Sequence, residues 1–281
     1  MTPFAAVFSV EMRVMLSRFS AKAMLILSLL AGIAVPLLVV ALHSNIDGSN
    51  IMVQSQGQPV QGSQITTFFQ NAIGNNVAAC MGRVLQARNF FLIPLLILLA
   101  AATSFAGERG SNELRESLCQ PISRSKLLVG KSLALLSLCG ISLLVTYVPS
   151  LIIGFGYYEE SGAVGAVSMA YLLTLLSDLA IILLAFACGT FSKSSSTATV
   201  LTFFFLIANF VLYSLLSFAK FYAAPESAEL LMQLAEYLPW KSFSAWENWE
   251  KGWLYAPIIG LLGIIASLQG FLYWRFTKMD V

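Results

Sequence analysis

Residues 108–126 read ERGSNELRESLCQPISRSK, a charged stretch between two long apolar runs. It holds three acidic and four basic side chains, although charged residues make up only 11% of the 281-residue chain. Leu114 and Leu118 lie four positions apart, which places them on one face of a helix. Pro121 ends this pattern because it lacks an N–H donor and disfavours helical backbone at Gln120. The charged stretch therefore predicts a short surface helix held between two membrane-embedded segments.

The composition is that of a membrane protein. Hydrophobic residues make up 58% of the chain and the mean hydropathy is +0.79, whereas soluble proteins are roughly 45–50% apolar. About 20 apolar residues in a helix cross the hydrocarbon core, and six runs approach or exceed this length: 22–42, 89–107, 127–156, 165–190, 197–219 and 253–275. These runs are continuous, without the alternating polarity of barrel strands. The sequence predicts an all-α integral membrane protein with six transmembrane helices.

The N-terminal region is expected to stay with the protein. The first run follows Arg13, Arg18 and Lys22, but it is longer than the apolar core of a signal peptide, about 7–15 residues. Residues 3–20 carry apolar side chains on a broad helical face, with Ser9, Arg13, Ser17 and Ser20 opposite. This pattern predicts an amphipathic helix in the membrane interface, with an early start of the first span as the alternative.

The distribution of Lys and Arg predicts the orientation, since the richer side faces the cytoplasm. Eleven of the sixteen lie on one side: Arg13, Arg18, Lys22, Arg109, Arg115, Arg124, Lys126, Lys131, Lys193, Arg275 and Lys278. We therefore expect cytoplasmic termini, a cytoplasmic segment 108–126, and extracytoplasmic segments 44–88 and 220–252. The net charge of +2 includes no basic block for nucleic acid.

Both extracytoplasmic segments contain apolar residues at helical spacing. One surface helix is expected within residues 65–87, and another is marked by Leu230, Leu231, Leu234 and Leu238. Trp240 and Trp246 then lie close to the last span, where indole rings favour a membrane interface. The second of these segments is interpreted either as a hairpin in the outer membrane interface or as a simple belt of aromatic side chains.

The sequence gives no pattern for catalysis or metal binding. Gly130-Lys131-Ser132 is similar to the end of a phosphate-binding loop, but Ser125 stands where that loop requires glycine and no strand precedes it. His43 is the only histidine, which excludes a Ser-His-Asp triad and a histidine metal cluster. The four cysteines form no Cys-x-x-Cys pair, and we expect no disulfide within the chain.

Asp178 is the ionisable residue in the middle of a predicted span, and we expect no acidic or basic partner for it within the spans. An intramembrane carboxylate is costly and is often functional, as a proton site or a substrate contact. A hydrogen bond to a neighbouring helix, or a neutral acid, is the alternative that we favour. Asn209 and Tyr213, one turn apart on the fifth span, are further candidates for lining a pathway.

Residues 108–131 resemble the permease subunits of type-2 ABC exporters. Glu108-Arg109 ends the second span, spaced Leu114 and Leu118 follow, and Pro121-Ile122-Ser123-Arg124 precedes Lys131 at the head of the third span. These positions match the coupling helix of that family. Asn112-Glu113 differ, because the family usually has Gly-Thr there. The N-terminal amphipathic helix, the six spans and the segment before the last span are also similar to the family's layout.

The resemblance implies a mechanical role for the charged stretch. The coupling helix would fit into a cleft of a separate cytoplasmic ABC ATPase, which binds ATP and Mg²⁺ while this chain binds no cofactor. Glu108 and Arg109 would orient the helix, and Lys193 would make a second contact. The docking contacts would come from Glu113, Arg115, Glu116 and Arg124, next to Pro121 and Ser123 of the motif. In the alternative interpretation, the charges of residues 108–126 only fix the orientation of the chain in the membrane.

We therefore expect a permease subunit of an exporter in the bacterial cytoplasmic membrane. It would act with a second copy of itself or a homologous permease, and would export a hydrophobic, lipid-like or peptide substrate between the two copies, along a path lined by spans two and five. A self-contained secondary transporter or channel using Asp178 is the alternative function. A non-transporting membrane scaffold is a third.

Overall fold

The computed structural model describes residues 3–48, 54–55, 58–59, 76–90, 92–111, 123–192, 194–219, 222, 225–250 and 255–278. Six segments are long and apolar enough to cross a membrane: Phe19–Leu42, Leu92–Gly110, Arg124–Tyr157, Val164–Gly189, Ser195–Ala219 and Pro257–Phe276. The described residues are helical apart from short connections and one antiparallel pair, β1 (Gln54–Ser55) with β2 (Gln58–Pro59). The predicted all-α membrane fold with six transmembrane helices is confirmed.

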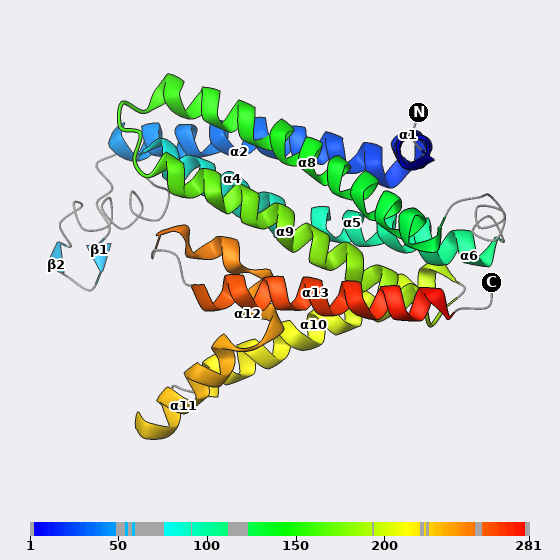
Figure 1. Cartoon of the computed structure of the whole chain (residues 1–281). Coiled ribbons are helices and arrows are strands. Elements are labelled where there is room, and N and C mark those ends of the chain that lie inside the picture. The colour runs from blue at the N-terminus through cyan, green and yellow to red at the C-terminus, as the bar shows by residue number, and fades with distance from the viewer. Residues whose placement is uncertain are drawn as a thin grey trace.

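The chain bends between its first two helices, α1 (Pro3–Ser17) and α2 (Phe19–Gly48). Figure 1 shows α1 nearly end-on, while α2 runs along the bundle. α1 packs against the start of α8 (Arg124–Tyr157), where a Cβ added at Gly130 would lie 2.9 Å from Cγ1 of Val7. Residues 3–17 are thus helical and docked on the bundle, and their place in a membrane interface stays a prediction.

A further helix, α4 (Val77–Asn89), precedes the second transmembrane segment. That segment consists of α5 (Leu92–Ala102), the π-helix η1 (Thr103–Gly107) and α6 (Glu108–Gly110), and Figure 1 shows all of them following one another along the bundle. The sequence places a surface helix within residues 65–87, but the described part of it is buried against α2, α8 and α9 (Val164–Gly189). The sequence indicates a surface position for α4 because Arg83 and Gln86, which hydrogen-bond each other at 2.8 Å, interrupt its apolar residues.

The turn between α8 and α9 holds the N-terminus of α4. Asn76 Oδ1 accepts a hydrogen bond from the Ala79 N–H at 2.9 Å. The two preceding N–H groups, of Val77 and Ala78, donate to the carbonyls of Glu160 and Ser161 at 3.1 Å. Gly162 has φ +61°, and a Cβ there would lie 2.6 Å from Asn76 Oδ1. Three of the four unpaired N–H groups at this helix start are thereby satisfied.

α9 is the central helix of the bundle. Within its most apolar 18 residues 78% are buried, compared with 6% for α10 (Ser195–Ala219). Close to its C-terminal end, the Phe186 ring stacks on Phe105 of η1 at 5.1 Å, and Phe105 contacts Phe276 of α13 (Tyr255–Thr277) at 5.7 Å. Large side chains therefore fill the interior of the single chain.

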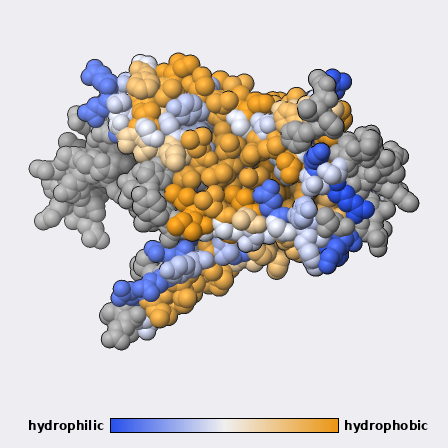
Figure 2. All heavy atoms as spheres, viewed as in Figure 1, coloured by the Kyte–Doolittle hydropathy of each residue, from blue (hydrophilic) through white to orange (hydrophobic). Residues whose placement is uncertain are grey.

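α10 and α11 (Pro225–Glu236) form an arm that diverges from the bundle in Figure 1. The arm carries exposed apolar side chains, among them Phe204, Leu215 and Phe218. In Figure 2 hydrophobic atoms line its outer side, while hydrophilic atoms gather on the side toward the bundle. The helix predicted around Leu230 and Leu234 is present in α11; its depth in a membrane stays a prediction.

The chain returns from the arm to the bundle through α12 (Pro239–Phe243) and η2 (Ala245–Glu250). Trp240 contacts Phe210 of α10 with ring centroids 4.9 Å apart. Trp246 is buried and belongs to the same apolar cluster as Val77 and Tyr171. Trp246 therefore packs in the core and does not form part of an exposed aromatic belt.

Candidate functional site

Four charged side chains meet at the end of the bundle that contains α6 and the start of α8, here called the α6 end. Lys131 Nζ lies 2.6 Å from Glu11 Oε1 and 2.5 Å from Glu108 Oε2. Arg18 Nη2 lies 2.9 Å from the second oxygen of Glu108, Oε1. We call Glu11, Arg18, Glu108 and Lys131 the charge cluster. It joins α1, the bend before α2, α6 and α8.

The charge cluster is buried and formally neutral. Lys131 is 1% exposed, and Glu108 and Glu11 are 7% and 9% exposed. Removing one partner of a buried ion pair typically costs about 3–5 kcal/mol, because the other charge stays behind unpaired. The four residues consequently hold their helices in one arrangement, although their net contribution to stability compared with apolar side chains is small.

The sequence offers a signal for this cluster that hydropathy alone does not use. Glu11 lies four residues from both Val7 and Met15, which are buried, so it belongs to the inward-facing stripe of α1. Lys131 lies inside a long apolar run and needs a partner for the same reason. What the sequence cannot supply is the pairing, because the bonded residues are up to 120 positions apart.

Arg109 and Arg124 contact the ends of two other spans. Arg109 Nη1 donates to the carbonyl of Thr190 at 2.8 Å and to that of Gly189 at 3.4 Å, at the C-terminus of α9. Arg124 Nη1 donates to the carbonyl of Phe276, close to the C-terminus of α13, at 3.2 Å. The last carbonyls of a helix carry partial negative charge, which guanidinium groups stabilise. The residues that flank segment 112–122 are thus tied to the bundle.

Several residues expected in the coupling contact lie outside the described residues. These are Glu113, Arg115, Glu116, Pro121 and Lys193, together with Leu114, Leu118 and Ile122. Ser123 is described and stands at the N-cap of α8, where its hydroxyl makes no capping bond. The predicted helix between Leu114 and Leu118 therefore stays a prediction.

Asp178 has a basic partner, which comes from α4 and lies outside the six candidate spans. Arg88 Nη2 donates to Asp178 Oδ2 at 2.7 Å, and Arg88 Nη1 donates to Oδ1 at 3.3 Å. Both residues are buried, at 0% and 2% exposure. The pair is extended by Arg88 Nη1, which donates to Asn89 Oδ1 at 2.8 Å, and by Asn89 Nδ2, which donates to Thr174 Oγ1 at 3.3 Å.

Arg88 was assigned by the sequence pattern to an extracytoplasmic segment because it precedes the apolar run of the second span. Its position in α4 gives the missing signal: Val77, Met81 and Leu85 precede it on one buried helical stripe. Asp178 therefore hydrogen-bonds to a neighbouring helix, which is the alternative favoured from the sequence. The partner is a charged arginine, which was not expected.

Asn209 and Tyr213 lie on α10, away from both charged sites. The Asn209 side chain donates to the carbonyl of Phe205 in its own helix at 2.8 Å, and both residues are half-buried. Among the described contacts, none joins either residue to Asp178 or to the charge cluster. The structure does not gather the three pathway candidates into one site.

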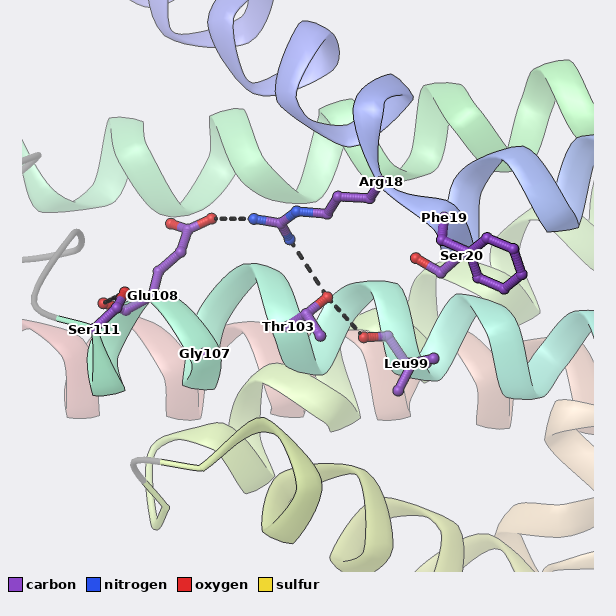
Figure 3. Close-up of a pocket in the computed structure, with 8 residues that line it drawn as sticks. All are labelled: Arg18, Phe19, Ser20, Leu99, Thr103, Gly107, Glu108 and Ser111. Atoms are coloured by element: carbon purple, nitrogen blue, oxygen red, sulfur yellow. Dashed lines mark hydrogen bonds and ion pairs between the residues drawn. The ribbon is translucent and has the colours of Figure 1, made fainter.

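A pocket of about 480 Å³ opens beside the charge cluster (Figure 3). It is lined by Arg18, Phe19, Ser20, Leu99, Thr103, Gly107, Glu108 and Ser111. Within the described part of the chain, no group of three His, Cys, Asp or Glu side chains is placed to hold a metal ion. The residues at the α6 end thus offer ionic and hydrogen-bonding contacts.

Comparison with protein families identifies the family of the chain. A family model described as ABC-2 family transporter protein matches residues 20–281, which include all six candidate spans. A search of curated proteins finds no match. The family match agrees with the motif at residues 108–131 and with the six-helix membrane fold. The chain therefore belongs to the ABC-2 family of transporter proteins.

Proposed function

We propose that this permease transmits force from a separate cytoplasmic ABC ATPase to the membrane through residues 108–126. The observation that carries the proposal is the attachment of both ends of segment 112–122. Before it, Glu108 binds Arg18 and Lys131 and Arg109 binds the end of α9; after it, Arg124 binds α13. A push on this segment would reach α1, α2, α8, α9 and α13 together.

In this proposal the partner ATPase binds ATP and Mg²⁺, and two permease copies, or one copy and a homologous permease, export a hydrophobic, lipid-like or peptide substrate. The proposal places the α6 end and both termini in the cytoplasm of a bacterial cell, with the spans in its cytoplasmic membrane. The filled interior around Phe105 and Phe186 favours a substrate path between two copies over a path through one.

The test is charge reversal within the segment. We expect Arg115→Glu to abolish transport and to prevent this subunit from stimulating the co-purified ATPase, because the docking contact becomes repulsive. Arg13→Glu is the matched control, since Arg13 is exposed on α1 and the charge change is the same. Membrane insertion of both variants is checked by protease accessibility. Transport and ATPase stimulation that survive Arg115→Glu would contradict the proposal.

A secondary transporter is the second candidate, and the intramembrane Arg88–Asp178 pair is the observation that favours it. This alternative predicts transport driven by a proton gradient without ATP, abolished by Asp178→Asn. Gradient-driven transport in proteoliposomes that contain only this chain would replace the ATPase-coupled proposal. A scaffold, by contrast, would neither transport nor stimulate any ATPase.

A further inference from the structure

The pocket at the α6 end is lined by polar and apolar side chains together (Figure 3). The polar ones are the guanidinium of Arg18, the carboxylate of Glu108 and the hydroxyls of Ser20, Thr103 and Ser111. The apolar ones are Phe19 and Leu99, which are 83% and 38% exposed at the start of α2 and within α5. Exposed apolar groups on membrane spans face hydrocarbon. The lining is therefore amphiphilic and borders the membrane.

Arg18 keeps hydrogen-bonding capacity for a ligand. Its side chain is 22% exposed and donates two bonds among the described residues, to Glu108 Oε1 at 2.9 Å and to Thr103 Oγ1 at 3.4 Å. A guanidinium has five N–H donors, so three are left. The Thr103 hydroxyl also contacts the carbonyls of Leu99 and Ala100, at 2.9 and 3.0 Å, so its proton is already engaged.

Ser20 gives a second, independent indication of a ligand. It is 7% exposed, and its hydroxyl has no hydrogen-bond partner within the described part of the chain. Figure 3 shows this hydroxyl turned away from the Phe19 ring, toward the space between α2 and α5. The hydroxyl lines the pocket and is open to it, so an oxygen-rich headgroup there would accept its hydrogen bond.

The charges around the pocket favour an anion. Glu108 is the carboxylate in the lining, and it is already neutralised by both Arg18 and Lys131. Lys22 follows Arg18 by one turn of α2 and is exposed, so it adds a positive charge next to Arg18. Basic side chains beside transmembrane helices can bind lipid headgroup phosphates. Free phosphate would leave Phe19 and Leu99 uncovered.

We propose that this pocket binds one anionic phospholipid. The lipid phosphate accepts hydrogen bonds from Arg18 and Ser20, and its acyl chain covers Phe19 and Leu99. The bound lipid would rest against the bend between α1 and α2 and against η1, so its occupancy would brace the charge cluster.

The experiment measures lipid binding to the delipidated full chain in neutral detergent. Phosphatidylglycerol is added, and retained lipid is counted by native mass spectrometry while the melting temperature is followed. Phosphatidylcholine tests the headgroup charge, and inorganic phosphate at the same phosphate concentration tests the need for acyl chains. We expect phosphatidylglycerol alone to be retained and to raise the melting temperature.

Two variants test the pocket by different routes. Arg18→Met removes the guanidinium and leaves Glu108 paired with Lys131, while Ser20→Leu fills the pocket and leaves the Arg18–Glu108 pair intact. Each variant should weaken phosphatidylglycerol binding by about tenfold or more, the equivalent of one charge-assisted hydrogen bond. Arg13→Met, which changes an exposed arginine of α1, should bind like the unaltered chain.

Four results would overturn the proposal. Equal binding of phosphatidylglycerol and phosphatidylcholine would show that the headgroup charge is not recognised. An equal effect of inorganic phosphate would indicate a phosphate site without a lipid. An equal loss in Arg13→Met would indicate diffuse attraction to the basic surface. If Arg18→Met lowers the melting temperature without lipid, its weaker binding could reflect a loss of structure, and Ser20→Leu becomes the deciding variant. Unchanged phosphatidylglycerol binding by Ser20→Leu would refute the pocket.

Discussion

At the scale of single residues, the polar groups inside this bundle are organised as matched pairs. Lys131 is shared by two carboxylates, and Glu108 is shared by two basic side chains, so the charge cluster carries no net charge. The Arg88–Asp178 pair is neutral in the same way. Neutral pairing lowers the cost of burying charge, and each pair is long-range in sequence, so it specifies which helices must meet.

The Arg88–Asp178 pair yields a stability prediction. We expect Asp178→Ala to lower the free energy of unfolding by about 3–5 kcal/mol, because Arg88 stays buried without its counter-ion. The double variant Arg88→Met, Asp178→Leu removes both charges and should recover most of that loss. Thermal melts in detergent measure both changes, and Arg83→Met in the same helix serves as the control with a small effect. A double variant less stable than Asp178→Ala would contradict the assignment.

At the scale of elements, α2 and α8 pack so closely that their contact requires glycine. A Cβ at Gly32 would lie 2.9 Å from the Thr146 carbonyl oxygen and 3.0 Å from both Thr146 Cα and the Val145 carbonyl oxygen. One turn away, the hydroxyls of Ser28 and Ser142 lie 2.6 Å apart, and Thr146 Oγ1 donates to the Ser28 carbonyl at 3.2 Å. Small residues permit such close approach of membrane helices.

This contact predicts that Gly32→Ala destabilises the protein. The added methyl group meets backbone atoms that cannot move aside without separating the helices, and overpacking of this kind costs about 1–3 kcal/mol. Gly263→Ala in α13 is the matched control, since nothing lies within 4 Å of its Cβ and alanine favours a helix. A lower melting temperature for Gly32→Ala and an equal or higher one for Gly263→Ala are expected. Equal effects would contradict the close contact.

The elements that can be predicted from the sequence are those whose apolar runs exceed a membrane thickness. All six spans meet that condition, because lipid-facing helices must be apolar whatever surrounds them. α4 fails it, because its apolar residues alternate with Arg83, Gln86 and Arg88; Arg83 and Gln86 bond each other, and Arg88 pairs with Asp178 of α9. Pairings such as Glu11 with Lys131 depend on how helices assemble, and hydropathy carries no information on that step.

At the scale of the whole molecule, the bundle and the arm divide two tasks. The α6 end ties the charged stretch to five helices through Glu108, Arg109 and Arg124. The arm of α10 and α11 leaves the bundle and exposes Phe204, Leu215 and Phe218. In the proposed assembly, a second permease covers the apolar side of α10, and movement at the α6 end shifts one copy relative to the other.

This arrangement predicts cross-linking between copies through α10. Phe204→Cys, in a Cys119→Ser background and with the described native cysteines buried, should give a product of twice the chain mass with a bifunctional maleimide in native membranes. Leu144→Cys, on exposed α8, is the matched control and should give none. If α10 faces only lipid, the cysteines at positions 204 and 144 should cross-link alike, because helix association in membranes requires specific packing and not apolarity. Equal cross-linking at residues 204 and 144 would therefore place the partner elsewhere.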